Sequence, residues 1–247
     1  DELDQRSVTL QKEGNYVGAL EAVEEALRKR KELYGVDSEQ VSKTCERVCE
    51  LCNLMAIQYL ERQEYAISLD LLKKAELLSD KSLKSKATTL NNFACYFRKV
   101  GKLKTALKFL ERALNLESES ADTHLNMCAV LSQLGKHNSA AEHAMQAIIL
   151  LQEQTIERLT NSPNEDDRSS VLAIAFHNLA VEFEFLKRFN EALMYYGKAL
   201  GFARSHLPQD HKLVKDLEEI HDTARKQFSK VKARVPGEVL DKLISAC

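Results

Sequence analysis

Three closely spaced cysteines are the side chains of this chain with the clearest capacity for chemistry. They are Cys45, Cys49 and Cys52, and the last two form a C-x-x-C motif. A zinc site needs four converging ligands, and no second cysteine pair of suitable spacing follows. A redox C-x-x-C lies at a helix start beside a strand, whereas no strand pattern is visible here. Spacings of four and three place the thiols on one helix face, which predicts buried, reduced cysteines without a metal.

The other titratable side chains form no pattern typical of catalysis or of cofactor binding. His137 and His143 lie six residues apart, a spacing that prevents them from sharing a metal on one helix. Phosphate-binding glycine loops, H-E-x-x-H and G-x-S-x-G are absent. A net charge of −2 and a pI near 6.4 do not favour nucleic-acid binding, and no apolar run approaches the ~20 residues that span a bilayer. We therefore predict a non-enzymatic chain without a cofactor, a nucleic-acid partner or a membrane-inserted segment.

A fourteen-residue pattern occurs five times along the chain, starting at residues 14, 63, 101, 135 and 187. The sixth position of each copy is small and the thirteenth is alanine. Because seven residues make two helical turns, both positions lie on one helix face, where a neighbouring helix must approach closely. The small residues are Ala19, Ser68, Ala106, Ala140 and Ala192, and the alanines are Ala26, Ala75, Ala113, Ala147 and Ala199.

An amphipathic stretch precedes each copy, so each unit is predicted to be a pair of helices. Such units stack on their neighbours, which predicts one all-α solenoid over 1–231, with repeats at 2–36, 38–80, 84–118, 120–160 and 168–207 and a capping helix over 210–231. The expected helices are 2–13, 17–34, 38–62, 65–79, 84–99, 103–117, 120–134, 138–160, 168–186, 190–207 and 210–231, with Asp37-Ser38 and Ser120 as candidate N-caps.

The segment 232–247 is expected to be a linker followed by a short amphipathic helix over 237–246. This helix either packs back on the solenoid or begins the next part of a longer protein. The polar segment 160–169 is predicted to be a loop, and it contains a Ser162-Pro163 sequence whose geometry would permit phosphorylation of Ser162.

These repeats resemble the tetratricopeptide repeat, a thirty-four-residue motif of two helices with bulky, small and aromatic residues at set positions. The resemblance is carried by Phe93-Ala94, Phe97, Gly101, Ala106, Leu110 and Ala113, and again by Leu179-Ala180, Phe183, Phe189, Ala192, Tyr196 and Ala199. The first repeat departs from the motif, because Arg6 and Ser7 fall where a large and a small apolar residue are usual. Membership implies a right-handed superhelical solenoid of about five repeats whose first helices line a concave, partner-binding groove.

A narrower resemblance concerns the end of the first repeat. The stretch ALRKRKELYGVDS over 26–38 is similar to the long repeats of kinesin light chains, in which a Tyr-Gly or Leu-Gly turn precedes an acidic, polar loop. It implies a repeat subtype and weakly suggests cargo adaptation.

The family resemblance places asparagines at one first-helix position, two residues before the small one. Here these are Asn92, Asn126 and Asn178. A carboxamide can bind a peptide N–H and C=O together, so a ladder of asparagines would hold an extended backbone. The alternative is that these side chains pack between neighbouring helices. Further groove positions are Asn91, Arg98, Lys99, Leu125, Gln133, His177 and Phe185, a mixture suited to a motif with acidic residues and apolar anchors.

Some relatives clamp a chaperone's terminal carboxylate with paired cations. This chain has Asp4, Asn53, Asp122 and Ile174 at the positions needed, so we predict that it does not bind chaperone tails.

The resemblance and the groove positions predict a cytoplasmic adapter module that binds a protein or peptide. The alternative function is a scaffold of a cytoskeletal, centriolar or ciliary assembly, with self-association through a solenoid end or the C-terminal segment.

Overall fold

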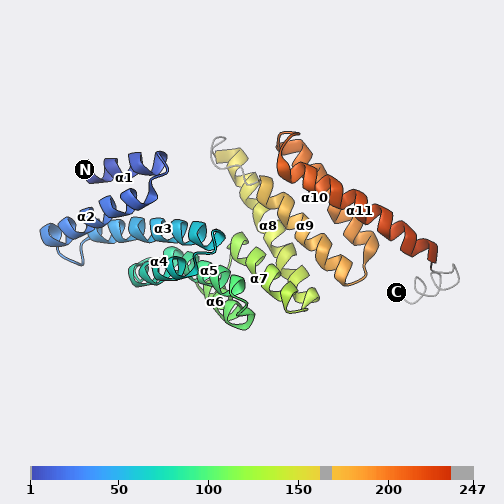
Figure 1. Cartoon of the computed structure of the whole chain (residues 1–247), viewed down its shortest axis with the longest axis horizontal. Helices are drawn as coiled ribbons and strands as arrows, with labels where there is room; N and C mark the ends of the chain where they lie inside the picture. Colours follow the sequence, from blue (N-terminus) through green and yellow to red (C-terminus); the bar gives the residue numbers. More distant parts are fainter. Residues whose placement is uncertain (1, 162–168, 235–247) are drawn as a thin grey trace. The chain divides into compact units, whose positions relative to one another are not determined.

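The computed structural model describes residues 2–161 and 169–234, and the side chains of 2–155 and 169–230. Within these ranges the chain forms helices and no strand (Figure 1). The helices are α1 (Glu2–Lys12), α2 (Tyr16–Tyr34), α3 (Glu39–Glu61), α4 (Tyr65–Leu78), α5 (Leu83–Lys99), α6 (Leu103–Leu116), α7 (Ala121–Gln133), α8 (His137–Asn161), α9 (Ser169–Phe185), α10 (Phe189–His206) and α11 (Lys212–Arg234). The contacts divide the chain into two compact units, Asp1–Asn126 and Met127–Cys247, each described below by itself.

The predicted helices are confirmed, with every boundary within three residues of the expected one. The fold is an all-α helical-repeat solenoid, as expected. Ser38 caps α3 by accepting a hydrogen bond from the Val41 N–H at 3.3 Å, and the Ser120 hydroxyl accepts one from the Thr123 N–H. The short helix predicted over 237–246, and Ser162, lie outside the described residues.

Each hairpin of two consecutive helices buries two small residues that are twelve positions apart. The pairs are Ser7 and Ala19, Ala56 and Ser68, Ala94 and Ala106, Cys128 and Ala140, and Ala180 and Ala192, and each residue is at most 1% exposed. In two hairpins a serine of the pair donates to the backbone of its partner: Ser7 Oγ to Ala19 O at 3.1 Å, and Ser68 Oγ to Ala56 O at 2.9 Å. The unusual Ser7 therefore fills the small position, and the hydroxyl is satisfied internally.

The repeat alanines and two of the three clustered cysteines lie in the core. Ala26 is 4% exposed, and Ala75, Ala113, Ala147 and Ala199 are fully buried. Cys49 and Cys52 are also fully buried on α3, as predicted, whereas Cys45 is only half-buried against that core, and the five cysteines among the described residues are free. Burial raises the pKa of Cys52 to about 12, so this thiol stays protonated and unreactive near neutral pH.

One residue in each turn between paired helices adopts the left-handed conformation. These residues are Gly14, Gln63, Gly101, Gly135 and Lys187, with φ between 61° and 77°. In every turn the N–H that follows bonds to a carbonyl five residues earlier, as from Lys102 N to Phe97 O at 2.8 Å. This is the Schellman arrangement that closes a helix, and it favours glycine because a Cβ is strained at positive φ.

Replacing Gln63 or Lys187 by glycine should stabilise the fold by up to about 1 kcal/mol each, since the strain of a Cβ at positive φ is removed while backbone freedom increases. Urea denaturation followed by circular dichroism measures the change. The reverse substitution, Gly101→Ala, is the matched control and should destabilise the fold by a similar amount. Its added Cβ would contact no other atom, so the loss would come from the positive φ at this position alone. A loss of stability in both glycine variants would contradict the strain argument.

Candidate functional site

A groove of about 440 Å³ lies between α3 and α5, the first helices of the second and third repeats. It belongs entirely to the first compact unit. The α3 wall includes Glu46, Glu50, Asn53, Leu54 and Ile57, and the opposite wall includes Ser82, Lys84, Ser85, Thr88 and Asn92. Carboxylates, amides, hydroxyls, a lysine and apolar side chains are thus gathered in one concave surface.

Buried amides link the two walls of this groove. Asn92 Nδ2 donates to Asn53 Oδ1 at 3.0 Å, and Asn53 Nδ2 donates to Thr89 Oγ1 at 2.9 Å. Thr89 in turn donates to the backbone oxygen of Ser85 at 2.8 Å. Asn53 is 5% exposed and Asn92 is 9% exposed, so these bonds form where water competes little. They hold α3 and α5 in a defined register.

A second amide pair has the same form. Asn126 Nδ2 on α7 donates to Asn91 Oδ1 on α5 at 3.0 Å. In both pairs the donor lies two residues before the small residue of its hairpin, and the acceptor lies three residues before the small residue of the preceding hairpin. The predicted asparagines Asn92 and Asn126 therefore each bond to a neighbouring first helix through Nδ2. On Asn92 a second amide hydrogen and the Oδ1 atom remain, whereas the Asn126 side chain also makes a hydrogen bond to the Cys95 thiol.

Other predicted positions of the first unit lie on α5 and α7. Arg98 is half-buried, and its Nε atom has no hydrogen-bond partner among the described residues. Lys99 is exposed at the end of α5, and Leu125 is half-buried on α7. Of the predicted asparagines in this unit, Asn91 and Asn126 therefore pair with each other, and Asn92 pairs with Asn53.

Four predicted positions belong to the second compact unit. Gln133 is exposed, and His177 and Asn178 are half-buried on α9. Phe185 is 59% exposed and stacks on His137 with ring centroids 4.3 Å apart. His137 Nδ1 in turn lies 2.8 Å from Oε2 of the buried Glu182.

His177 and Asn178 are less engaged than the asparagines of the first unit. Burial lowers the pKa of His177, so its ring is neutral, and its buried Nδ1 has no partner in the described part of the chain. In the same ranges Asn178 makes no side-chain hydrogen bond.

Sequence reasoning missed the α3 wall of the groove. Asn53, Glu46, Glu50, Leu54 and Ile57 were not predicted site residues, although all five line the cavity. A usable signal was present, because Asn53 stands three residues before the small Ala56, the register that Asn91 occupies in the next repeat. The search for asparagines at a single position passed over it.

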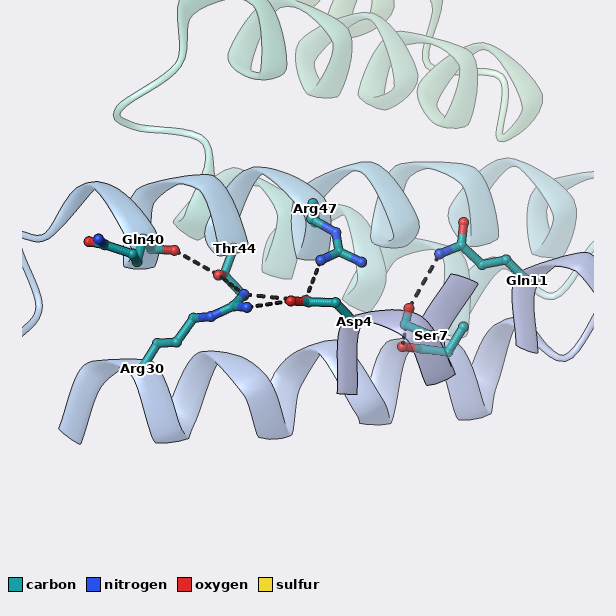
Figure 2. A network of polar contacts seen from close by, with 8 residues as sticks. Asp4, Ser7, Gln11, Arg30, Gln40, Thr44 and Arg47 are labelled. Carbon is teal, nitrogen blue, oxygen red and sulfur yellow. Dashed lines mark hydrogen bonds and ion pairs between the residues drawn. The ribbon is translucent and has the colours of Figure 1, made fainter. Parts of the chain in front are cut away.

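A carboxylate and two guanidinium groups fix α1 on the next two helices (Figure 2). Asp4 of α1 pairs with Arg30 of α2 and with Arg47 of α3. Arg30 also donates to Thr44 Oγ1 at 2.6 Å, and Thr44 donates to the backbone oxygen of Gln40 at 2.7 Å. Both arginines are thus paired within the chain.

The pKa of Asp4 reflects this pairing. Partial burial acts to raise it, but the hydrogen bond from Arg30 and the charges of Arg47 and Arg30 outweigh burial and leave the pKa below its ordinary value. A carboxyl with a depressed folded-state pKa contributes stability above its unfolded pKa, and that contribution is lost as the pH falls through the folded value.

Comparison with known proteins identifies the repeats. A family model described as tetratricopeptide repeat matches residues 3–40 and 86–116, and a second model with the same description matches residues 173–206. These matches assign the first, third and fifth repeats to the tetratricopeptide-repeat family. A search of curated proteins found none that matches it.

Solved structures share the tetratricopeptide-repeat fold at low sequence identity. BtubC (BKLC) from P. vanneervenii is 14% identical, with 85% of this chain and 91% of that chain covered and a TM-score of 0.61. PilF of Pseudomonas aeruginosa is 19% identical, with 77% of each chain covered and a TM-score of 0.54. The nearly identical repeats assigned to a kinesin light chain of Podosopora anserina are 14% identical, with coverages of 76% and 95% and a TM-score of 0.54. These likenesses establish the fold alone.

The described residues contain no group of three or more His, Cys, Asp or Glu side chains placed to hold a metal ion. Among their helices, none combines the length and apolar character needed to cross a membrane. The tetratricopeptide fold supports a protein-binding role in general.

Asn92→Ala should destabilise the protein by about 1–3 kcal/mol, because it leaves the buried Asn53 Oδ1 without its donor. The double variant with Asn53→Ala should lose less than the sum of the two single losses, since one bond cannot be removed twice. Urea denaturation of all three variants measures the coupling. Asn115→Ala, at an exposed position on α6, is the control and should change stability by less than about 0.5 kcal/mol. Strict additivity would show that the Asn53–Asn92 bond contributes nothing.

Asp4→Asn should weaken the attachment of α1 by about 1–2 kcal/mol at neutral pH, since it removes a partly buried charge pair. Because the lost contribution exists above the unfolded aspartate pKa of about 3.9, the gap between wild type and variant should close as the pH falls below it. Hydrogen exchange of the α1 amides between pH 3 and 7 gives the measurement. Glu2→Gln, at an exposed position of the same helix, is the control. A gap independent of pH would argue against the ion pair.

Proposed function

We propose that this chain is a cytoplasmic adapter module that binds an extended segment of a partner protein along its first helices. The observation that carries the proposal is the α3–α5 groove, where two walls fixed by the Asn53–Asn92 bond leave a cavity of about 440 Å³. A cavity that is rigid before binding loses little conformational freedom when a partner enters it.

The groove offers the contacts that an extended peptide needs. Thr88 is an exposed hydroxyl on one wall, and Leu54 is an apolar side chain on the other. The free hydrogen and the Oδ1 atom of Asn92 can bond to a peptide carbonyl and N–H. Peptide binding through backbone hydrogen bonds with pockets for alternate side chains is a common mode of recognition.

A second candidate function, self-association as a scaffold, is favoured by a different observation. Five of the most exposed large apolar side chains of the first unit lie around the α2–α3 and α4–α5 turns, which the Asp37–Lys81 ion pair joins. They are Leu33, Tyr34, Val36, Leu77 and Leu83, each between 56% and 79% exposed. Apolar clusters of this kind mark interaction surfaces. Light scattering of the wild type and of Leu77→Glu separates a monomer from an oligomer formed through this edge.

Site-specific photo-crosslinking tests the adapter function. A photoreactive amino acid at Thr88 or at Leu54 should crosslink to the same segment of one partner in a cell extract, because both positions line the groove. The same amino acid at Asp70, exposed on α4, is the control and should not select that segment. Equal crosslinking from Asp70 and from the groove positions would refute groove binding.

Replacing Asn92, Asn126 and Asn178 together by alanine should weaken binding of the crosslinked partner roughly a hundredfold, at on the order of 1 kcal/mol for each lost hydrogen bond. Calorimetry at a temperature where the variant remains fully folded gives the affinity. The matched control replaces Asn115, Asn138 and Asn190, three exposed asparagines on second helices. Unchanged affinity in the first triple variant would exclude an asparagine ladder.

A further inference from the structure

The second repeat carries an apolar side chain where the later repeats carry asparagine. Two residues before the small position stand Asn92, Asn126 and Asn178 in the third to fifth repeats, but Leu54 in the second. Leu54 is 43% exposed, and the half-buried Ile57 lies on the same face of α3, three residues on. Both side chains line the groove, so this step of the groove presents an apolar surface and not an amide.

Two carboxylates precede that apolar surface along α3. Glu46 and Glu50 are one helical turn apart, and Glu50 is one turn before Leu54. Within the described ranges neither glutamate makes an ion pair or a hydrogen bond. The neighbouring cation on α3, Arg47, is bound to Asp4 instead.

The groove as a whole is weakly negative. Lys84 is the basic residue among those that line it, so its walls carry two negative charges against one positive. The two glutamates also act on Cys49, which lines the groove. Burial raises the pKa of this thiol, and the charges of Glu50 and Glu46 raise it further. A cationic side chain of a partner would be attracted to this end of the groove.

We propose that the α3–α5 groove selects a partner segment in which a lysine or arginine lies two positions from a large apolar residue. The cation would pair with Glu50 and Glu46, and the apolar side chain would seat on Leu54 and Ile57. Four residues of α3 rise about 6 Å, and two residues of an extended chain advance about 6.6 Å with both side chains on one face. The inference rests on the proposed function and specifies the chemistry of its partner.

An acidic segment is the competing occupant. Arg98 and Lys99 led the sequence analysis to predict an acidic segment, and they lie at the C-terminal end of α5. The groove wall itself holds Glu46 and Glu50. The sign of the preferred charge therefore decides between the two.

Labelled twelve-residue peptides test the preference against the full chain by fluorescence anisotropy. The basic probes carry Lys or Arg two positions before or two positions after Leu or Phe in a Ser-Gly background, and the acidic probes replace the cation by Asp or Glu. We expect basic probes to bind about tenfold more tightly, with the preference declining as salt is raised. Glu46→Gln with Glu50→Gln should weaken the basic probes about tenfold and abolish the preference. Leu54→Ser should weaken both sets.

The control variant, Glu21→Gln with Glu111→Gln, removes two exposed carboxylates from second helices and should leave the preference intact. Tighter binding of acidic probes, or equal binding of both sets, overturns the charge inference. The proposed function then still stands if Thr88 crosslinks to a single partner segment. Failure of every probe overturns the inference as well, and the proposed function falls with it only if the groove crosslinks also select no segment.

Discussion

The distance between paired helices is the constraint on which the rest of this structure depends. In every hairpin the two helices meet at small residues twelve positions apart, and none of these ten side chains is more than 1% exposed. A larger side chain at either position would separate the helices and open a cavity or force strain into the contact. The twelve-residue interval also fixes the turn, because a chain that reverses so tightly between two helices must pass through a left-handed residue, even where that residue is Gln63 or Lys187.

A constant crossing point gives each first helix a constant register, and the asparagine pairs follow from that register. Asn92 meets Asn53, and Asn126 meets Asn91, always from two residues before one crossing to three residues before the previous one. A carboxamide has more hydrogen-bonding capacity than one bond uses. The same side chain can therefore set the spacing of two helices and still present atoms to a partner, so a structural and a binding role are not exclusive at Asn92.

The sequence predicted what depends on local periodicity and missed what depends on contacts between repeats. The helices and the buried cysteines follow from spacings within one element, which is why the boundaries agree to a few residues. The α3 wall of the groove was missed because Asn53 occupies the acceptor register, one residue before the position that the family resemblance highlights. The Asp4 network was also beyond sequence reasoning, since Asp4 lies 26 residues from Arg30 and 43 from Arg47, and no local pattern joins them.

Acidic residues of similar chemistry serve different purposes in the first unit, and their surroundings explain why. Asp4 lies against two guanidinium groups, so its charge is neutralised inside the fold and contributes to the attachment of α1. Glu50 lies on the groove wall without an ion pair among the described residues, so the fold gains nothing from its charge. The same reasoning applies to Leu54, whose exposed apolar surface is a cost to the free protein that only an occupied groove would remove. Side chains that bind a partner should therefore be sought where a polar or apolar group is displayed without any benefit to the free chain, and in this unit that criterion points first to Glu50 and Leu54 on the α3 wall.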